Sequence, residues 1–285
     1  MIRILQGDCI ESLKTLEDGS INTCITSPPY WGLRNYNDES KQLGMEDTPE
    51  EFVENLVNVF KEVKRVLRDD GTLWLNMGDT YKEKQLLGIP WRTALALQKD
   101  KWFLRADIIW NKPAVMPNSV KDRVTITHEY IFLLSKNKQY YYDNEIIKED
   151  STYTNTKGEY RPNGMSGIGK KSQGKDGFGI RSGLSSMEEQ PKRNKRSVWT
   201  ITTKPFKGAH FATFPKDLIE PCVLAGCPEG GTVLDPFGGS GTTGIVAAGH
   251  NRNAVLLELN AEYIELAKAR IEKDMGMFVD LTVET

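Results

Sequence analysis

Apolar residues recur at two different spacings along the first half of the chain. From residue 52 onward they follow the three- and four-residue intervals of an amphipathic helix, at Phe52, Leu56, Val59, Phe60, Val63 and Leu67. Thr48 is placed to act as the N-cap, Pro49 suits the first turn, and Glu51 completes a capping box. With Gly71 able to end it, the pattern predicts a helix over about residues 49–69.

Continuous apolar runs without helical spacing lie on either side of this helix, near residues 21–26 and at 72–76. Strand, helix and strand in this order predict a parallel sheet with helices on its faces. A second helix is expected to begin near Pro90, and strands are expected at 103–110 and 128–135. Residues up to 147 therefore have the pattern of an α/β unit.

The same alternation of elements returns after residue 205. The pattern predicts, in order, a helix at 215–226, a strand at 232–235, a helix of small residues reaching about 249, a strand at 254–258 and a last helix capped by Asn260. This is another β–α–β unit, and we find no internal sequence repeat.

Between these two parts the composition changes abruptly, over residues 148–197. This stretch has eight glycines, little hydrophobic periodicity, and eleven Lys or Arg against six Asp or Glu, a net charge of +5 that leaves −7 for the rest. It ends in the basic run Lys192-Arg193-Asn194-Lys195-Arg196. A glycine-rich insertion of this kind is either a solvated linker or a binding element, and its positive charge favours contact with phosphate.

The totals describe an ordinary globular chain of 285 residues, 39% hydrophobic and 27% charged, with a net charge of −2. This length suits one large domain, or one domain with an insertion, and any nucleic-acid surface must be a local patch. The four cysteines form no CxxC pair and no metal-like array with histidine, so no metal is expected. Without a signal peptide or a membrane-spanning stretch, the protein is expected to be soluble and cytoplasmic.

The segment Ser27-Pro28-Pro29-Tyr30 follows the apolar run that ends at Thr26. Two prolines restrict the backbone here and leave their carbonyl oxygens free to accept hydrogen bonds. A hydroxyl, two acceptors and an aromatic ring at the end of a strand suit a flat substrate that carries an amino group. A Pro-Pro pair by itself is more often an exposed turn, so this motif alone is only suggestive.

A glycine loop, Asp235-Pro236-Phe237-Gly238-Gly239-Ser240-Gly241-Thr242, stands between a predicted strand and a predicted helix. Glycines there let a ligand approach the backbone at a helix N-terminus. Glu258 ends the next strand, 20 residues after Gly238, where a carboxylate can bind ribose hydroxyls. The loop is neither GxGxxG nor a P-loop, so neither NAD nor ATP fits well. A tight strand-to-helix turn with an incidental acid is the alternative, but the strand before, the helix after and the spaced glutamate together favour a nucleoside ligand.

Together, the SPPY segment and the DPFGGSGTT loop resemble the motif pair of the S-adenosylmethionine-dependent DNA amino-methyltransferases, which methylate N4 of cytosine or N6 of adenine. Catalytic motif first, basic insertion next and cofactor loop last is the order of the family's β class. The resemblance implies a Rossmann-like α/β fold with a mostly parallel seven-stranded sheet and one antiparallel strand. It divides the chain into a catalytic half (1–147), an inserted target-recognition region (148–197) and a cofactor-binding half (198–285).

The resemblance also implies roles for individual residues. The catalytic residues would be Ser27, Pro28, Pro29 and Tyr30, with Ser27 and the Pro28 carbonyl accepting hydrogen bonds from the target amine and Tyr30 stacking on the extruded base. S-adenosyl-L-methionine would be bound by Asp8, Cys9, His210, Phe211, Thr213, Asp235, Pro236, Phe237, Gly238, Gly239, Ser240, Gly241, Thr242 and Glu258. DNA phosphates would be contacted by Lys192, Arg193, Lys195 and Arg196.

Serine in the catalytic motif is commoner in the cytosine-N4 enzymes of the family, which favours cytosine N4 as the target and leaves adenine N6 as the alternative. Methyltransferases of RNA or of protein glutamine usually have asparagine in place of Ser27 and the reverse motif order. A DNA-binding protein without activity is the non-enzymatic alternative. The expected partners are double-stranded DNA with a flipped base and a cognate restriction endonuclease, and the protein would be a monomer or a homodimer.

Several single residues admit two interpretations. Cys222 follows a proline, as the nucleophile of cytosine-C5 methyltransferases does, but its apolar helical surroundings favour an inert packed thiol. Tyr140, Tyr141 and Tyr142 could stack on bases, although sheet and core positions are commoner for tyrosine. Trp31 could extend the stacking platform or pack in the core.

Overall fold

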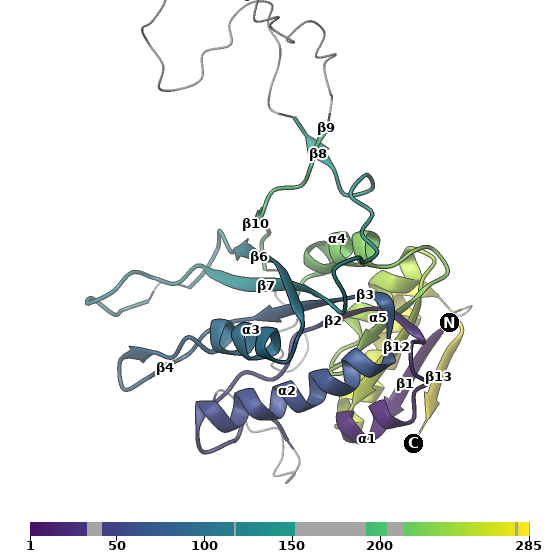
Figure 1. The fold of residues 1–285 in the computed structure, drawn as a ribbon, viewed down its shortest axis with the longest axis horizontal. Coiled ribbons are helices and arrows are strands. Elements are labelled where there is room, and N and C mark those ends of the chain that lie inside the picture. Colours follow the sequence, from purple (N-terminus) through teal and green to yellow (C-terminus); the bar gives the residue numbers. More distant parts are fainter. Residues whose placement is uncertain (33–41, 117, 152–191, 204–213, 277–278, 285) are drawn as a thin grey trace, which may run out of the picture.

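The computed structural model describes residues 1–32, 42–116, 118–151, 192–203, 214–276 and 279–284. Its centre is a nine-stranded sheet (Figure 1). In spatial order the strands are β10 (Val198–Thr200), β6 (Phe103–Asn111), β7 (His128–Ser135), β3 (Leu67–Met77), β2 (Ile21–Thr26), β11 (Thr232–Asp235), β12 (Asn253–Glu258), β1 (Ile2–Gln6) and β13 (Leu281–Glu284).

The sheet is parallel throughout except at β7, which runs antiparallel to both of its neighbours, β3 and β6. The prediction of a mostly parallel sheet with one antiparallel strand is therefore confirmed. The sheet is wider than the seven strands expected, because the short strands β10 and β13 extend it at its two edges.

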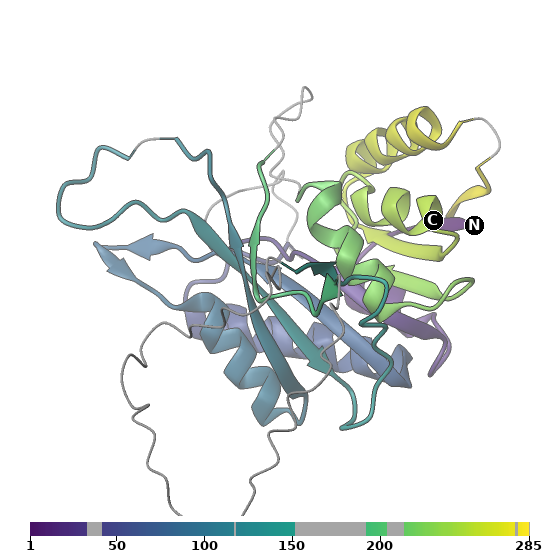
Figure 2. The ribbon, with the colours of Figure 1, turned by 90° about the horizontal axis from the view of Figure 1, so that it is seen from above.

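Helices cover both faces of the sheet, as Figures 1 and 2 show from two directions. On one side α1 (Cys9–Lys14), α2 (Pro49–Val66) and α3 (Ile89–Lys99) close a core that contains Phe52 and Phe60. On the other side α4 (Lys216–Gly226), α5 (Thr242–Gly249) and α6 (Ala261–Met275) close a second core. A doubly covered sheet explains why its central strands are apolar runs.

Helix α2 begins as its sequence predicts, with the Thr48 hydroxyl accepting from the Glu51 N–H in a complete capping box. The predicted end near residue 69 is wrong, because the helix stops at Val66 and Leu67 is already extended. Gly71 lies inside β3 and does not end the helix. A Cβ there would approach the Arg68 carbonyl oxygen to 2.9 Å, so close packing of the backbone requires the glycine.

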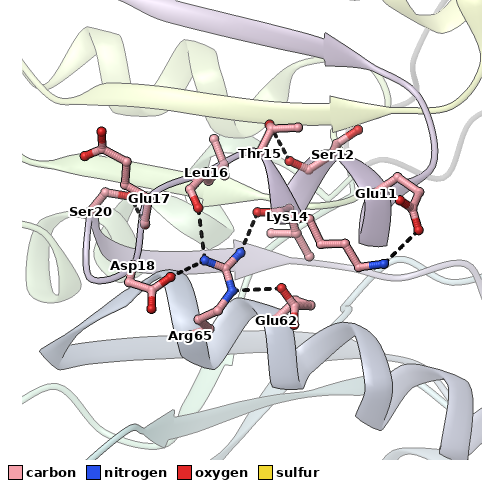
Figure 3. Close-up of polar contacts among 11 residues, drawn as sticks. Glu11, Ser12, Lys14, Thr15, Leu16, Glu17, Asp18, Ser20, Glu62 and Arg65 are labelled. Atoms are coloured by element: carbon pink, nitrogen blue, oxygen red, sulfur yellow. Dashed lines mark hydrogen bonds and ion pairs between the residues drawn. The ribbon is translucent and has the colours of Figure 1, made fainter.

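Arg65, in the last turn of α2, fixes the connection between α1 and β2 (Figure 3). Its guanidinium donates to the carbonyl oxygens of Leu16 (3.0 Å) and Leu13 (2.8 Å), and it also binds the Asp18 and Glu62 carboxylates. This network lies where β2 starts, and it sets the position of the strand whose other end carries Ser27.

Two small two-stranded ribbons stand outside the main sheet. Strands β4 (Tyr81–Lys82) and β5 (Gln85–Leu86) form one, and β8 (Glu149–Asp150) and β9 (Lys192–Arg193) form the other. The β8–β9 ribbon projects from the body of the molecule and lies at the base of the segment 152–191 (Figure 1). Among the described residues, no helix is both long and apolar enough to cross a membrane.

Candidate active site

The catalytic motif and the glycine loop start from neighbouring parallel strands, β2 and β11. Since parallel strands place their carboxyl ends at one edge of the sheet, Ser27 and Pro236 leave the sheet side by side. The Thr26 hydroxyl donates to Asp235 Oδ1 at 2.6 Å and joins the two segments directly. The pairing of β2 with β11 therefore brings the two motifs together at adjacent strand ends.

Asp235 is a buried connecting residue at this junction, with 2% of its surface exposed. Besides Thr26, it accepts hydrogen bonds from the Phe237 N–H (3.1 Å) and from the Thr243 hydroxyl (2.6 Å) at the start of α5. Burial raises the pKa of Asp235 from 3.8 to about 6, although the hydrogen bonds oppose the rise. Both carboxylate oxygens thus serve to hold the catalytic strand, the loop and α5 together.

The glycine loop needs its glycines for space and for backbone conformation. A Cβ at Gly238 would lie 2.9 Å from the Leu256 Cβ of β12, and the Gly238 N–H donates to the Leu257 carbonyl at 2.8 Å. Gly241 has a φ of +76°, which side-chain-bearing residues rarely adopt, and it is the N-cap of α5. The loop therefore packs closely against β12 and leads directly into the N-terminus of α5.

Arg270 of α6 binds the glycine loop through hydrogen bonds. Its guanidinium donates to the Ser240 carbonyl at 2.6 Å and to the Thr242 hydroxyl at 3.2 Å, and it also binds the Ser240 hydroxyl. Ser240 and Thr242 are each only 4% exposed. These side chains therefore face the interior and fix the shape of the loop, whereas Phe237 and Gly239 are only half-buried.

Glu258 lies at the carboxyl end of β12, beside the loop. Its carboxylate accepts hydrogen bonds from the Gly239 N–H (2.8 Å) and the Asn260 N–H (2.9 Å), and its carbonyl accepts from the Gly7 N–H (3.0 Å). Burial raises the pKa of Glu258. The acid is preorganised by backbone donors, in a position where its remaining acceptor capacity can serve the hydroxyls of a ribose.

Asp8 follows β1, the strand next to β12, and is the N-cap of α1. Its Oδ1 accepts from the N–H groups of Ile10 (3.0 Å) and Glu11 (3.1 Å). Cys9 is half-buried beside it, and burial raises the pKa of its thiol to about 12. The ends of β1, β12, β11 and β2 thus line up Asp8, Glu258, the glycine loop and Ser27 along one edge of the sheet.

Tyr30 is held in a tight slot on the catalytic side of this edge. Its hydroxyl donates to Glu129 Oε2 at 2.7 Å, and a Cβ at Gly78 would come within 2.8 Å of its ring. Burial and the Glu129 carboxylate raise the pKa of Tyr30, and the nearby Ser27 side chain opposes the rise. The phenol is therefore neutral and acts as a hydrogen-bond donor at a fixed position.

Glu129 is a site residue that the sequence analysis missed. It sits at the start of β7, where it also accepts from Asn76 Nδ2 of β3 at 3.2 Å and pairs with Lys112. The side chains of Glu129 and Lys112 are 14% and 18% exposed. An acid inside the pattern of a predicted strand gives no indication of this role, because only the antiparallel placement of β7 beside β3 brings Glu129 to the end of β2.

The basic run at the end of the insertion is partly neutralised within the protein. Glu149 Oε1 accepts from Arg193 Nε at 2.9 Å and from Arg196 Nε at 2.5 Å, and Lys195 lies 5.1 Å from the centre of the Trp199 ring. Phosphate contacts by Lys192, Arg193, Lys195 and Arg196 remain a prediction.

The remaining expectations divide by location. His210, Phe211 and Thr213 lie outside the described residues. Cys222 is 1% exposed and its pKa is raised by burial, which agrees with an inert packed thiol. The three tyrosines 140–142 are not in a strand, and Tyr142 stacks on Trp74 with ring centres 6.2 Å apart. Trp31 is 7% exposed and its indole N–H donates to the Glu46 carbonyl, so it packs in the core.

A mostly parallel sheet covered on both faces, with a glycine loop and an acid at adjacent strand ends, is the architecture of the S-adenosylmethionine-dependent methyltransferases. The comparison with family models specifies the group within that class. A model described as DNA methylase matches residues 21–269, and the chain belongs to this N6/N4 DNA methylase family.

Individual relatives agree with this assignment. The chain is 42% identical to the type II methyltransferase M.Cfr9I of Citrobacter freundii, over 94% of this chain and 87% of that one. It is 43% identical to M.SmaI of Serratia marcescens, over 94% and 90%. Among solved structures, the putative DNA modification methylase TTHA0409 of Thermus thermophilus, complexed with S-adenosyl-L-methionine, has a TM-score of 0.66 and 25% identity over the whole of both chains. The PvuII cytosine-N4-specific methyltransferase has the same fold, with a TM-score of 0.68 at 18% identity over 99% and 94%.

The cofactor of this family, S-adenosyl-L-methionine, fits the residues at the strand ends. Among the described residues, a Cβ at Gly239 would meet only the Phe237 carbonyl oxygen, at 3.8 Å, so these residues leave space beside the loop backbone there. Glu258 and Asp8 supply carboxylates within the same row of strand ends. When bound, the cofactor supplies an electrophilic methyl group.

Proposed function

We propose that this DNA methyltransferase transfers the methyl group to the exocyclic N4 amine of cytosine in double-stranded DNA. The observation that carries the proposal is the junction of β2 and β11, where one buried carboxylate, Asp235, binds both the catalytic strand and the cofactor loop. A base that reaches Ser27 is then next to the methyl donor. Much of the acceleration in this proposal comes from that alignment.

In the proposed mechanism, the Ser27 hydroxyl and the Pro28 carbonyl accept hydrogen bonds from the two amine hydrogens of the target base. These bonds localise the nitrogen lone pair, which is otherwise delocalised into the ring. A nitrogen–carbon bond forms as the sulfur–methyl bond breaks, and one amine proton leaves to solvent. Tyr30, held by Glu129, packs against the base after it has left the duplex. No covalent bond between base and protein is needed, which agrees with the burial of Cys222.

The choice of cytosine N4 rests on Ser27, since serine at this position resembles the cytosine-N4 enzymes. Incubation with unmethylated duplex DNA and S-adenosyl-L-methionine, followed by digestion and mass spectrometry of the nucleosides, tests the proposal. N4-methylcytosine is the expected product. N6-methyladenine would contradict the cytosine assignment, and methylation of RNA or protein with none of DNA would contradict the substrate class.

The role of Ser27 is tested by Ser27→Ala, with Ser20→Ala as the matched control. Ser20 lies before the other end of β2, where its hydroxyl donates to the Glu17 carbonyl. We expect kcat to fall at least tenfold in Ser27→Ala with an unchanged affinity for S-adenosyl-L-methionine, and no change in the control. Full activity in Ser27→Ala would remove this hydroxyl from the mechanism.

The type II designation of the relatives supports a restriction endonuclease as the cellular counterpart of this enzyme. Methylated DNA from the mass-spectrometry experiment tests this counterpart. The methylated sequence must coincide with the cleavage site of the restriction endonuclease, and methylation must protect the DNA from cleavage.

A further inference from the structure

Two hairpins flank the catalytic side of the sheet and project from it side by side, as both views show (Figures 1 and 2). One is the β4–β5 ribbon with its turn at residues 83–84, and the other is the loop 112–127 that joins β6 to β7, described except at residue 117. We call them together the two-hairpin surface. Neither was assigned a function by the sequence analysis.

The two-hairpin surface combines exposed apolar side chains with cations. Met116 is 90% exposed and Val124 is 83% exposed, far above the other large apolar side chains of the described chain. Leu86 and Val120, on the same two hairpins, are 45% and 41% exposed. Apolar side chains of this size in water indicate a surface that becomes covered by a partner.

The same two hairpins carry more cations than anions, which favours a polyanion as the partner. The hairpins carry Lys82, Lys84, Lys112, Lys121 and Arg123 against Glu83 and Asp122, a net charge of +3 in a chain whose total is −2. The Lys84 side chain is 89% exposed. Cations together with exposed apolar side chains on the same hairpins match a DNA duplex, which has phosphates on the outside and base steps within.

The hairpins are fastened to each other, so they form one surface. The Arg123 guanidinium lies 3.9 Å from the centre of the Tyr81 ring, and Lys84 Nζ lies 4.0 Å from the Asp122 carboxylate. The turn of the ribbon also has Glu83 at φ +52° and Lys84 at φ +66°. This conformation favours Asn-Gly, so the turn holds two charged residues at the cost of backbone strain.

Both hairpins are also connected to the catalytic segment. Lys82 Nζ of the ribbon lies 5.0 Å from the centre of the Trp31 ring, next to Tyr30. Lys112, the first residue of the loop, pairs with the same Glu129 that accepts from the Tyr30 hydroxyl. A duplex bound on this surface therefore lies at the entrance to the site of methylation.

We propose that the two-hairpin surface docks on the DNA duplex around the target base, with Met116 and Val124 contacting the base steps opened by its extrusion and Lys84 and Lys121 contacting phosphates. The proposal rests on the DNA-methylating function above and adds a second contact region to the basic insertion. Because Glu149 partly neutralises Arg193 and Arg196, the basic insertion offers less positive charge to DNA, and a second contact region would add to it. Apolar wedges of this kind lower the free energy of extrusion by replacing lost stacking.

The apolar contacts are tested with Met116→Ser/Val124→Ser, and Leu95→Ser, at a 54% exposed residue of α3, is the control. The probes are an unmethylated duplex in which the target base is paired and the same duplex in which the target base is mispaired. We expect at least a tenfold loss of kcat/KM on the paired duplex, largely restored by the mispair because a mispaired base is easier to extrude. An equal loss on both duplexes, or no loss, overturns the wedge.

The phosphate contacts are tested with Lys84→Ala/Lys121→Ala, and Lys273→Ala on α6 is the control. The plot of log binding constant against log salt should become shallower by about 0.9 for each phosphate contact removed. An unchanged slope overturns the proposal for these lysines. Affinity for S-adenosyl-L-methionine, measured in parallel, should be unchanged in every variant. If the unmodified protein methylates no DNA, the proposed function fails; if it does and the variants match it, only the two-hairpin surface fails.

Discussion

Tyr30 shows how a motif residue depends on neighbours that the motif does not contain. Its hydroxyl is bound by Glu129, its ring is confined by Gly78, and Glu129 is held in turn by Asn76 and Lys112. A buried carboxylate with three donors of this kind is a rigid anchor, because loss of any one donor leaves part of its charge unpaired. The position of the Tyr30 ring is thus fixed by contacts within the protein.

At the scale of single residues, we predict that Glu129→Ala lowers kcat on DNA about tenfold or more. The reason is that the Tyr30 hydroxyl loses its acceptor and Lys112 loses its partner. Glu129→Gln, which retains an acceptor, should recover part of the loss. Tyr30→Phe breaks the same hydrogen bond, so the double variant Tyr30→Phe/Glu129→Ala should lose less than the product of the single effects.

The matched control for Glu129 is Asp107→Ala, at an exposed acid on the neighbouring strand β6. Affinity for S-adenosyl-L-methionine, measured by calorimetry, should not change in any of these variants. Additive losses in the double variant, or a loss of cofactor binding, would show that Glu129 supports the fold in general and does not position Tyr30.

A second prediction at this scale concerns pH and Asp235. Because its pKa is raised from 3.8 to about 6, the folded protein holds the proton more tightly than the unfolded chain does. Ionised Asp235 therefore lowers stability, by about 3 kcal/mol above pH 6, and this cost is removed as pH falls from 6 towards 4. Asp235→Asn cannot titrate and is the reference.

The measurement is the free energy of unfolding of the wild type and of Asp235→Asn in urea at pH 7 and pH 5. The difference, wild type minus variant, should rise by about 1 kcal/mol at the lower pH. A fall in this difference would contradict a raised pKa. Asn offers one acceptor oxygen where Thr26 and Thr243 both donate, so the variant should also bind S-adenosyl-L-methionine more weakly.

At the scale of elements, helix α2 is the best example of a segment whose two ends are determined differently. Its N-terminus follows from the capping box at Thr48 and Glu51. Its C-terminus follows from tertiary contacts, since Leu67 enters β3 and pairs with Ile21 while Arg65 binds the α1–β2 connection (Figure 3). Helix propensity continues past Val66, but the buried position of Leu67 in the sheet prevails.

We therefore predict that Arg65→Ala lowers the free energy of unfolding by about 1–3 kcal/mol, because several carbonyl and carboxylate groups lose a charged donor. The control is Arg68→Ala, whose side chain is 53% exposed and pairs with Asp70. Since the network lies at the far end of β2 from Ser27, kcat at a temperature below the transition should be unchanged. Equal stability of the two variants would refute the role given to Arg65.

At the scale of the whole molecule, the N-terminal and C-terminal parts of the chain each contribute a strand to the other's side of the sheet. β1, from the N-terminus, pairs with β12 of the cofactor half and brings Asp8 beside Glu258. β10, which follows the insertion, pairs with β6 of the catalytic half. The glycine loop follows the SPPY segment in the chain, yet both lie in one continuous sheet. Both parts of the chain are needed to complete the row of strand ends.

The distribution of charge gives a prediction at this scale. Glu149 binds two of the arginines at the base of the insertion, so Glu149→Gln should release positive charge towards DNA. We expect severalfold tighter binding of duplex DNA at low salt and a steeper dependence on salt. The control is Glu265→Gln on α6, which pairs with Lys268. An unchanged salt dependence would mean that Arg193 and Arg196 contact no phosphate.

Much of the architecture follows from local pattern. The predicted strands at 21–26, 128–135 and 232–235 agree with β2, β7 and β11, and the small-residue helix ends at Gly249 as predicted. The short edge strands β10 and β13 were not predicted, because three or four residues carry too little periodicity. They form where a neighbouring strand offers free backbone groups, which is information that a linear pattern does not contain.

The sequence by itself determined the glycine loop, the acid at Glu258 and the catalytic segment at Ser27, because each is encoded within a few consecutive residues whose backbone demands are local. Only the tertiary structure decided the surroundings of Tyr30, the bridging position of Asp235 and the joined hairpins beside the site. Those arrangements depend on which strands are neighbours in the sheet. The meeting of Tyr30 with Glu129, 99 residues apart, is produced by the antiparallel strand β7 and by no motif in the chain.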